Sequence, residues 1–489
     1  MPAHEVRNDA SVAHGLAALT GTQRLDACGV TFLAAALLGN QLQHEVLYSV
    51  DGVVYALVGK ELSVRPLSEW ALLTWQGRPF FEHPHLTPWL LAASMKVLGV
   101  STFSVLLPIV LLSVATVVLT YRLGLALLGH GFGLLAATVL ALTPEFIRGG
   151  RNPMLEPALM FSVMLAVHSH VISTLPGRFV RGTVGVGVAT GLALLAKGPP
   201  AVLALAVIAF FQAAARLFPT AFDGFALTAR QCATQCGALV VVPAAMVLAV
   251  DLWYRHLTGT SFFGHYLGNQ LQFTIVEGRG AVANDWTYYA RTFVRDWPWW
   301  PFAVGGIALV VWRRDRVALP AATVGAGVTV GTYLGFSLMA HRAEWYVAIH
   351  HVGTSLLAAL ALRSLVPDRM LAAYFQRFVL AITLPLLTLS AIVPSLFLQY
   401  GRPLERFLDQ AQTELGERLA GVPVADCIGL EPWKGPFLVA FYLGTTRTAC
   451  GDPIARVKLV DTRRYVTGPG DTLVFSQQPF SLVSSPGVH

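Results

Sequence analysis

The chain has 489 residues, of which 55% are hydrophobic and only 12% are charged, with a formal net charge of +7. Soluble proteins average roughly 25% charged residues, so this composition excludes an ordinary soluble globular protein. A helix that crosses a bilayer needs about 20 consecutive, mostly apolar residues, and the chain has many such stretches.

About eleven apolar stretches are expected to form membrane-spanning helices, because backbone groups inside a bilayer must be hydrogen-bonded within the protein. They cover about residues 25–41, 102–124, 130–147, 155–174, 183–196, 199–215, 232–250, 298–312, 317–339, 346–364 and 372–395. The first stretch has a short core with small residues, so a cleaved signal peptide is the alternative there. The polar leader that precedes it is a poor match for such a peptide.

Arginines in the short loops predict the orientation, because positive charge is retained on the cytoplasmic side. If the N-terminus is cytoplasmic, the inner loops carry Arg122, Arg181 and Arg313. The long loops 42–101 and 251–297 then face outward.

The first of these outer loops is too long for a simple connection. It contains two amphipathic runs, one beginning at Asp51 and one at Pro84, which predict interfacial helices along the membrane surface. Trp70, Trp75 and Trp89 are expected at the depth of the lipid headgroups. Such helices would form a roof over a pocket at the membrane surface.

The tail after residue 398 differs in kind from the rest of the chain. LERFLDQAQTELGERLAG has a helical pattern, whereas FLVAFYLG, ARVKLVD and DTLVFSQ predict short strands separated by Pro and Gly. Cys427 and Cys450 both lie in this tail, where an oxidising compartment would allow a disulfide, and the sequence leaves their pairing open.

The expected organisation is therefore a cytoplasmic segment 1–24, a membrane domain 25–397, and a small domain 398–489 outside the cytoplasm. The membrane domain is all-α and polytopic, and the small domain mixes helices and strands.

Several short segments, in order along the chain, carry a resemblance to a known family. They are Asp51-Gly-Val-Val-Tyr55, Phe81-Glu-His-Pro84, Asn152-Pro-Met-Leu-Glu156-Pro157, Gly191-Leu-Ala-Leu-Leu-Ala-Lys197, and Tyr288-Tyr289 followed by Trp297-Pro-Trp299. In order, spacing and placement on one membrane face, this succession resembles the aminoarabinose-transferase and protein-mannosyltransferase group of GT-C glycosyltransferases.

The resemblance implies a GT-C membrane enzyme that takes one sugar from a polyprenyl-phosphate donor and passes it to an acceptor. That acceptor would be lipid A or another envelope glycan, a lipid or a protein. The implied location is the bacterial cytoplasmic (inner) membrane, as a multi-pass protein with its active site on the periplasmic face. Membrane lipids are expected partners, nucleic acids are not, and a monomer is expected.

Asp51 is the expected general base, which removes the acceptor hydroxyl proton while the sugar carbon C1 is attacked. One direct displacement would invert the anomeric centre. The structural alternative is a helix N-cap, and the two roles are compatible.

Glu156 stands where the family commonly has aspartate, and it would orient an acceptor or hold a metal ion. The alternative is a glutamate that is favoured at a helix N-terminus by the helix dipole. The family usually has a second acid after the first, where this chain has Gly52, and a lysine where it has His83. A permanently charged phosphate contact thus becomes a histidine.

Lys197 closes an apolar helix on the outer face and is the expected partner of the donor phosphate, with snorkelling toward the headgroups as the alternative. Gly187 and Gly191, in the same helix, have the spacing of small residues in helix packing.

The other residues assigned to donor and substrate binding are Tyr55, Glu82, His83, His265 and Tyr289. No cofactor is certain. A divalent cation, Mg²⁺, Mn²⁺ or Zn²⁺, would be held by the carboxylates of Asp51 and Glu156.

Two other classes of protein remain open. A secondary transporter or lipid flippase also carries ionisable groups at membrane depth, although transporters usually keep them near the midplane and contain inverted repeats. A noncatalytic assembly protein would use the tail to bind a partner. Sugar transfer that depends on Asp51 separates the enzyme from both.

Overall fold

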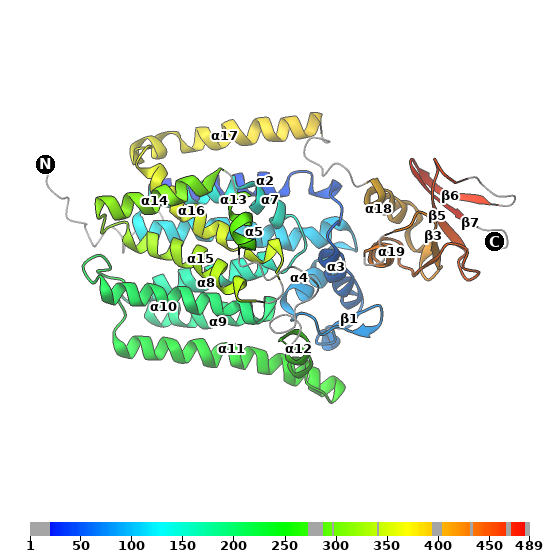
Figure 1. The fold of residues 1–489 in the computed structure, drawn as a ribbon, viewed down its shortest axis with the longest axis horizontal. Helices are drawn as coiled ribbons and strands as arrows, with labels where there is room; N and C mark the ends of the chain where they lie inside the picture. Colours follow the sequence, from blue (N-terminus) through cyan, green and yellow to red (C-terminus); the bar gives the residue numbers. More distant parts are fainter. Residues whose placement is uncertain are drawn as a thin grey trace.

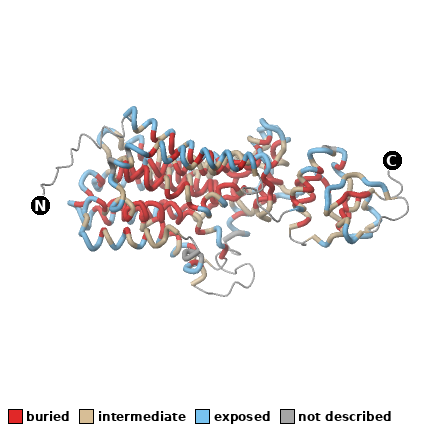
Figure 2. The backbone as a smooth tube through the Cα atoms, turned by 90° about the horizontal axis from the view of Figure 1, so that it is seen from above, coloured by how far each residue is buried: buried red, intermediate tan, exposed pale blue. Residues whose placement is uncertain are grey.

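The computed structural model describes residues 20–271, 287–295, 298–339, 342–393, 403–430, 434–465 and 471–484. Helices lie side by side in one bundle, and a part that contains strands lies beyond one end of it (Figure 1). Buried residues follow the interior of the bundle and continue into that C-terminal part (Figure 2).

All of the expected apolar stretches form helices. They are α2 (Gly21–Gly39), α5 (Thr102–Leu128), α6 (His130–Ala141) with α7 (Pro144–Gly150), α8 (Glu156–Ser173), α9 (Phe179–Lys197), α10 (Val202–Leu217), α11 (Ala229–Thr258), α14 (Trp299–Arg313), α15 (Leu319–Ser337), α16 (His350–Arg363) and α17 (Asp368–Ile392).

Fewer of these helices than expected meet the length and hydropathy of a membrane span. Among the described residues seven do, or eight if the α6–α7 pair, bent by 67°, is one span. The three others are α8, which carries Glu156, His168 and His170, and the short helices α14 and α16, with 15 and 14 residues. A straight crossing needs about 20 residues. The apolar pattern therefore predicted where the helices lie, but not which of them are long and apolar enough to span a membrane.

Small residues set the close contacts between helices. A Cβ added at Gly124 of α5 would lie 2.6 Å from the Cα of Gly133 in α6. A Cβ at Gly187 of α9 would lie 2.9 Å from the Ala238 carbonyl oxygen of α11, and one at Gly191 would overlap the sulfur of Met246. The expectation that Gly187 and Gly191 serve helix packing is confirmed.

The first long loop contains the two expected amphipathic helices, α3 (Val50–Ser63) and α4 (Leu86–Leu98). Between them lie a 3-10 turn, η2 (Leu67–Glu69), and a two-stranded hairpin of β1 (Thr74–Trp75) and β2 (Arg78–Pro79). Both helices lie at the end of the bundle that faces the C-terminal part (Figure 1).

The second long loop is shorter than expected, because α11 continues to Thr258. Asp251 explains the extension: it accepts a hydrogen bond from Arg255 one turn later, and its Oδ1 accepts the backbone N–H of Phe263 at 3.0 Å. Because the Asp251 carboxylate has hydrogen-bond partners, the helix can continue beyond the apolar stretch. It is followed by α12 (Phe262–Leu271) and α13 (Tyr288–Arg295), and residues 272–286 and 296–297 lie outside the described residues.

The C-terminal part holds two helices and a five-stranded sheet of order β4-β3-β5-β7-β6. Its elements are α18 (Pro403–Leu415), β3 (Val424–Asp426), α19 (Gly435–Leu443), β4 (Arg447–Ala449), β5 (Val457–Asp461), β6 (Thr472–Gln477) and β7 (Phe480–Ser484). Strand β3 pairs in parallel with β4 and β5, whereas β7 is antiparallel to β5 and β6. The helix predicted at the start of the tail and two of its three predicted strands, β5 and β6, are confirmed.

The strand predicted for FLVAFYLG is wrong, because this segment is helix α19. The helix connects the parallel neighbours β3 and β4, and a parallel pair requires such a crossover. Because α19 is packed against both α18 and α3, it is apolar on nearly every side, and a short apolar run of this kind does not reveal its period.

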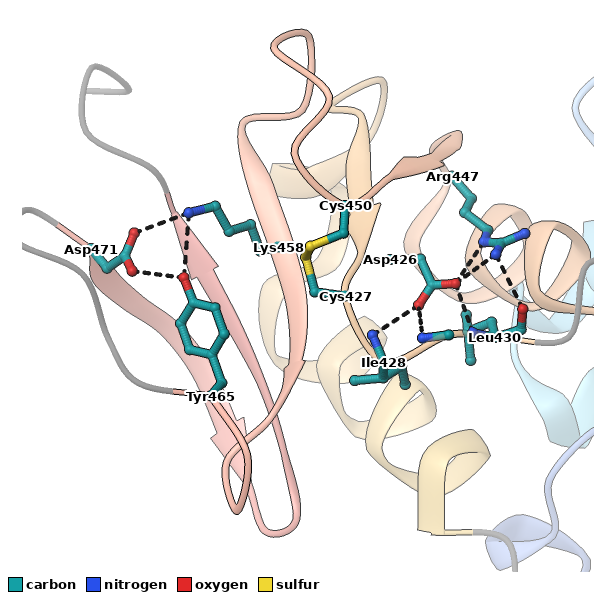
Figure 3. Close-up of a disulfide and its surroundings, with 10 residues drawn as sticks. Asp426, Cys427, Ile428, Leu430, Arg447, Cys450, Lys458, Tyr465 and Asp471 are labelled. Atoms are coloured by element: carbon teal, nitrogen blue, oxygen red, sulfur yellow. Dashed lines mark hydrogen bonds and ion pairs between the residues drawn. A yellow bond between two sulfur atoms is a disulfide. The ribbon is translucent and has the colours of Figure 1, made fainter.

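The cysteines of the tail, Cys427 and Cys450, form a disulfide that joins the ends of β3 and β4 (Figure 3). Asp426, beside it, accepts hydrogen bonds from three successive backbone N–H groups and from Arg447. The bond and the carboxylate together fix the loop after β3.

The C-terminal part is anchored to the bundle around α3. The Tyr442 hydroxyl accepts the Leu47 backbone N–H at 2.9 Å, and Lys60 of α3 donates to the Phe441 carbonyl at 2.6 Å. Asp409 of α18 accepts the hydroxyl of Thr102, at the start of α5, at 3.0 Å. Helix α19 thus contacts both the segment before α3 and the last part of α3, the helix that carries Asp51.

Candidate active site

Asp51 lies in the first turn of α3 and is half-buried. The N-cap of this helix is Ser49, whose hydroxyl accepts the Gly52 N–H at 3.2 Å, so the alternative of Asp51 as the N-cap is wrong. A carboxylate in the first turn is still favoured by the helix dipole. The Ser49 hydroxyl also donates to Asn152 Oδ1 at 2.7 Å, which ties the start of α3 to the segment that leads to Glu156.

Position 52 requires glycine, because Ser49, Asn152 and Pro153 lie too close for a side chain there. A Cβ at position 52 would lie 2.3 Å from the Ser49 hydroxyl oxygen, 3.0 Å from Asn152 Oδ1 and 3.1 Å from a ring carbon of Pro153. A second acid after Asp51, as in the resembled family, has no room here. The absence of that acid therefore goes together with the close contact between α3 and the 152–156 segment.

Glu156 and Lys197 form a buried ion pair between the first residue of α8 and the last residue of α9. The snorkelling alternative for Lys197 is therefore wrong, since only 7% of this residue is exposed. Its ammonium also lies 4.0 Å from the ring centroid of Tyr346 and 5.8 Å from that of Phe336. Glu156 uses one oxygen for Lys197, and its buried Oε2 has no hydrogen-bond partner among the described residues.

The chain turns sharply after Lys197. Gly198 has φ +74° and lies against the hydroxyl of Tyr266, which donates to the Lys197 carbonyl at 3.2 Å. A side chain at position 198 would be strained and would collide with that hydroxyl. The glycine thus allows α12 to cover the end of α9.

Tyr55 marks the point at which three carboxylates converge. It lies one turn after Asp51 on α3, and burial raises the pKa of its phenol well above the usual value. The negative charges of Asp51, Glu156 and Glu82 raise this pKa further, in that order. The structure thus brings together acids that are far apart in the sequence, and it surrounds a neutral phenol with them.

His83 lies in the loop before α4, and His265 lies in α12. The His83 ring meets Tyr55 edge to face, with centroids 5.4 Å apart. Phe81, two residues earlier, lies 4.6 Å from the ring of the exposed His265 in α12. His83 therefore lies against Tyr55, which is one turn from Asp51. His265 lies at an exposed position and reaches this region only through Phe81.

The neighbouring His85 has a different role. It is fully buried, it contacts the Ala71 carbonyl through Nε2 at 3.0 Å, and burial lowers its pKa to about 4. Within the described ranges no three His, Cys, Asp or Glu side chains come together as a metal site. The divalent cation expected at Asp51 and Glu156 stays a prediction.

Tyr289 is buried in α13, and its hydroxyl accepts the Ala343 backbone N–H at 3.2 Å. Burial raises the pKa of this phenol, and the charges of Arg342 and Glu156 act on it in opposite directions. Tyr289 is thus close enough to Glu156 to feel its charge, and it is bound to the segment that leads to η5.

Sequence reasoning missed two features of the site. Tyr346, in the 3-10 turn η5 (Glu344–Val347), lies over Lys197 and was not singled out, because an aromatic residue at a membrane surface has no distinguishing local pattern. The buried pair of Arg151 with Glu45, at 2.9 Å, was also missed. Its partners are 106 residues apart, so only the packing of the bundle reveals it.

Comparison with known proteins gives a match in sequence over part of the chain. A family model described as dolichyl-phosphate-mannose-protein mannosyltransferase matches residues 82–225, a stretch that includes Glu82, Glu156 and Lys197. No curated protein matches the chain significantly in sequence.

Two solved structures share the fold over nearly the whole chain. ArnT from Cupriavidus metallidurans bound to undecaprenyl phosphate is 14% identical with a TM-score of 0.61, covering 96% of this chain and 98% of its own. The apo state of the same protein is 13% identical with a TM-score of 0.58, covering 94% and 97%. The resemblance to the aminoarabinose-transferase and protein-mannosyltransferase group of GT-C glycosyltransferases is confirmed, in fold over nearly the whole chain and in sequence over residues 82–225.

Proposed function

We propose that the chain is a membrane glycosyltransferase that moves one sugar from a polyprenyl-phosphate donor to an acceptor hydroxyl outside the cytoplasm. One observation supports this most directly: Ser49, the N-cap of α3, is hydrogen-bonded to Asn152 in the segment before α8, and Asp51 and Glu156 both act electrostatically on the Tyr55 phenol. The similarity of the fold to ArnT, which was solved with undecaprenyl phosphate, supports the class of donor.

Asp51 would act as the base. In the proposed reaction the acceptor oxygen forms a bond to C1 of the sugar while the bond from C1 to the phosphate oxygen breaks. The acceptor proton passes to Asp51, and polyprenyl phosphate leaves with the electron pair. A single displacement of this kind inverts the anomeric configuration.

Glu156 would orient the acceptor or the sugar. Its Oε2 is buried without a partner among the described residues, so a ligand hydroxyl that donates to it would remove the cost of an unsatisfied acceptor. His83 and Lys197 would contact the donor phosphate, and Tyr55, Glu82, His265 and Tyr289 would complete the binding site. No step is assigned to a divalent cation.

The proposal is tested by transfer from a labelled polyprenyl-phosphate sugar, with the purified full-length protein in lipid nanodiscs. Asp51→Asn should lower turnover by about 10² to 10⁴, the usual contribution of a general base, with unfolding unchanged. The matched control is Asp223→Asn, which changes an exposed aspartate between α10 and α11 and should leave turnover intact. The anomeric configuration of the product, read by NMR, checks the inversion.

Two outcomes would contradict the proposal. Turnover of Asp51→Asn equal to that of the wild type would remove the base assignment. Sugar lipid that crosses the bilayer without transfer to any acceptor would favour the transporter or flippase class.

The acceptor and the membrane are also part of the proposal. Lipid A or another envelope glycan, a lipid or a protein would serve as acceptor, at the periplasmic face of the bacterial inner membrane. A single cysteine at the exposed position of Arg148 should react with an impermeant reagent from outside, and one at the exposed position of Arg314 only after permeabilisation. The opposite labelling would place the site in the wrong compartment for such donors.

A further inference from the structure

Arg342 is a buried cation that has no acidic partner among the described residues. Only 7% of the residue is exposed, and it lies in the segment between α15 and η5. Its Nη2 donates to the Ser337 carbonyl at 3.0 Å, and its buried Nε has no hydrogen-bond partner among the described residues. A buried charge without a partner is costly, so the position calls for an anion.

Arg151 provides an internal comparison, because it is exposed to the same 7%. Its guanidinium donates to the Glu45 carboxylate at 2.9 Å and to the Asn40 carbonyl at 2.6 Å. An arginine as deeply buried as Arg342 can therefore have an acidic partner in this protein. Arg342 has instead only a backbone carbonyl among the described residues.

The surroundings of Arg342 connect it to the site. The next residue, Ala343, donates its N–H to the Tyr289 hydroxyl, and Tyr346, four residues on, lies under the Lys197 ammonium. Arg342 is therefore next in the chain to a residue that is hydrogen-bonded to Tyr289, and it precedes the turn whose Tyr346 ring lies against Lys197.

The two side chains assigned above to the donor phosphate leave room for a further cation. Lys197 is already paired with Glu156, and His83 stands where the resembled family has a lysine. A guanidinium presents its Nε–H and one Nη–H in parallel, which matches two oxygens of a phosphate and gives a stronger contact than a neutral donor.

We propose that Arg342 binds the phosphate of the polyprenyl-phosphate donor through its Nε edge, next to Lys197. This inference rests on the proposed function for the identity of the donor. The phosphate is then held by a residue of the segment before η5, and this leaves Asp51 and Tyr55 to the sugar and the acceptor.

The test measures binding without transfer. A polyprenyl phosphate that carries no sugar, and the polyprenol of the same length, are titrated into the full-length protein in nanodiscs. Arg342→Gln should bind polyprenyl phosphate about 10- to 100-fold more weakly, the usual loss for a charge-assisted contact, and should bind polyprenol as the wild type does. Arg342→Lys, which keeps the charge but not the bidentate geometry, should fall between.

The matched control is Arg148→Gln, at the same end of the bundle, where an exposed guanidinium pairs with Glu145 within α7. It should bind both lipids as the wild type does. Unchanged phosphate binding by Arg342→Gln would overturn the inference. An equal loss of both lipids would also overturn it, because Arg342 would then only cap the end of α15 through Ser337.

The two proposals fail separately. A wild-type protein that transfers no sugar contradicts the proposed function, whatever it binds. The preference for phosphate over polyprenol, and its dependence on Arg342, is read without any transfer.

Discussion

The two ends of the bundle differ in how their buried polar groups are satisfied. At the end away from α3, Asp26 accepts from His130 at 2.8 Å and from Gln376 at 2.7 Å, and the other ring nitrogen of His130 meets the Tyr121 hydroxyl at 3.1 Å. Each of these polar side chains thus has at least one partner.

In a second network at that end, the polar side chains also have hydrogen-bond partners. His170 of α8 contacts Gln235 through Nδ1 at 2.7 Å and Gln212 through Nε2 at 3.0 Å. Gln235 in turn donates to Ser173 at 3.0 Å, and Gln212 accepts the Leu227 N–H at 3.2 Å. Because the network is closed, it ties α8, α10 and α11 together and leaves no group to bind a ligand.

Buried atoms without a partner among the described residues occur at both ends, but near the His170 network they belong to a threonine and a histidine, Thr183 Oγ1 and His168 Nε2. At the α3 end they include atoms of two charged side chains, Glu156 Oε2 and Arg342 Nε. Groups of this kind are costly in a folded protein and are expected where a ligand satisfies them. The comparison teaches that polar residues at the two ends, although similar in type, serve different purposes. The His170 end holds helices together, and the α3 end carries the charged groups that the proposed function assigns to binding.

The largest expected effect is at the buried pair of the α3 end. Lys197→Met leaves the Glu156 carboxylate buried and unpaired, and should lower the free energy of unfolding by about 3–5 kcal/mol. The double variant Glu156→Gln with Lys197→Met should recover much of this loss, since no charge is then left alone. The control, Arg148→Ala in an exposed pair, should cost about 0–1 kcal/mol in thermal unfolding. A single variant as stable as the wild type would show that the pair is not formed.

The second effect is a dependence of stability on pH through His85. Its pKa is lowered to about 4 in the folded protein, so the unfolded chain binds more protons between about pH 6.5 and 4. Stability should therefore fall as the pH falls through this range, by on the order of 3 kcal/mol, and level off below it.

Replacement of this histidine gives the matching test. His85→Gln should flatten the pH dependence of thermal unfolding, whereas His256→Gln, at an exposed position, should not. If His85→Gln keeps the full dependence, another group is responsible for it.

The closed network at the opposite end gives a smaller effect on stability and none on catalysis. His170→Leu leaves Gln235 and Gln212 each without one partner, and should cost about 2 kcal/mol of unfolding free energy. His168→Leu is the matched control on the same helix, because the buried Nε2 of His168 has no partner among the described residues, and it should cost less. Turnover per folded molecule should be unchanged in both. A loss of turnover in His170→Leu alone would break the distinction between the ends.

The smallest effect concerns the contact between the two helix starts. Gly52→Ala should push the Ser49 hydroxyl out of its capping position and cost about 1 kcal/mol, as the loss of an N-cap does. Turnover should fall as well, because the first turn of α3 carries Asp51. Gly149→Ala, where a Cβ meets nothing within 4 Å, is the control. Equal effects of the two substitutions would mean that the contact with Asn152 is not tight.

Much of the fold was predictable from local pattern. Runs of apolar residues predicted every helix of the bundle, and amphipathic runs predicted α3 and α4, because helix formation in a bilayer depends on composition over about 20 residues. The same reasoning failed at α19, where burial on several sides removes the period, and at the length of α11, where Asp251 is satisfied by its own neighbours.

The sequence by itself determined that this is a polytopic membrane protein, which end of the bundle carries the candidate site, and that Asp51, Glu156 and Lys197 are its notable charges. Only the tertiary structure decided that Glu156 pairs with Lys197, that Asn152 and Pro153 leave no room for a second acid at position 52, and that the segment of the buried Arg342 is bound to Tyr289. These contacts join residues 41 or more apart in the chain. Local pattern fixes which face of a helix is apolar, but the side chains that meet between helices depend on how the whole bundle packs.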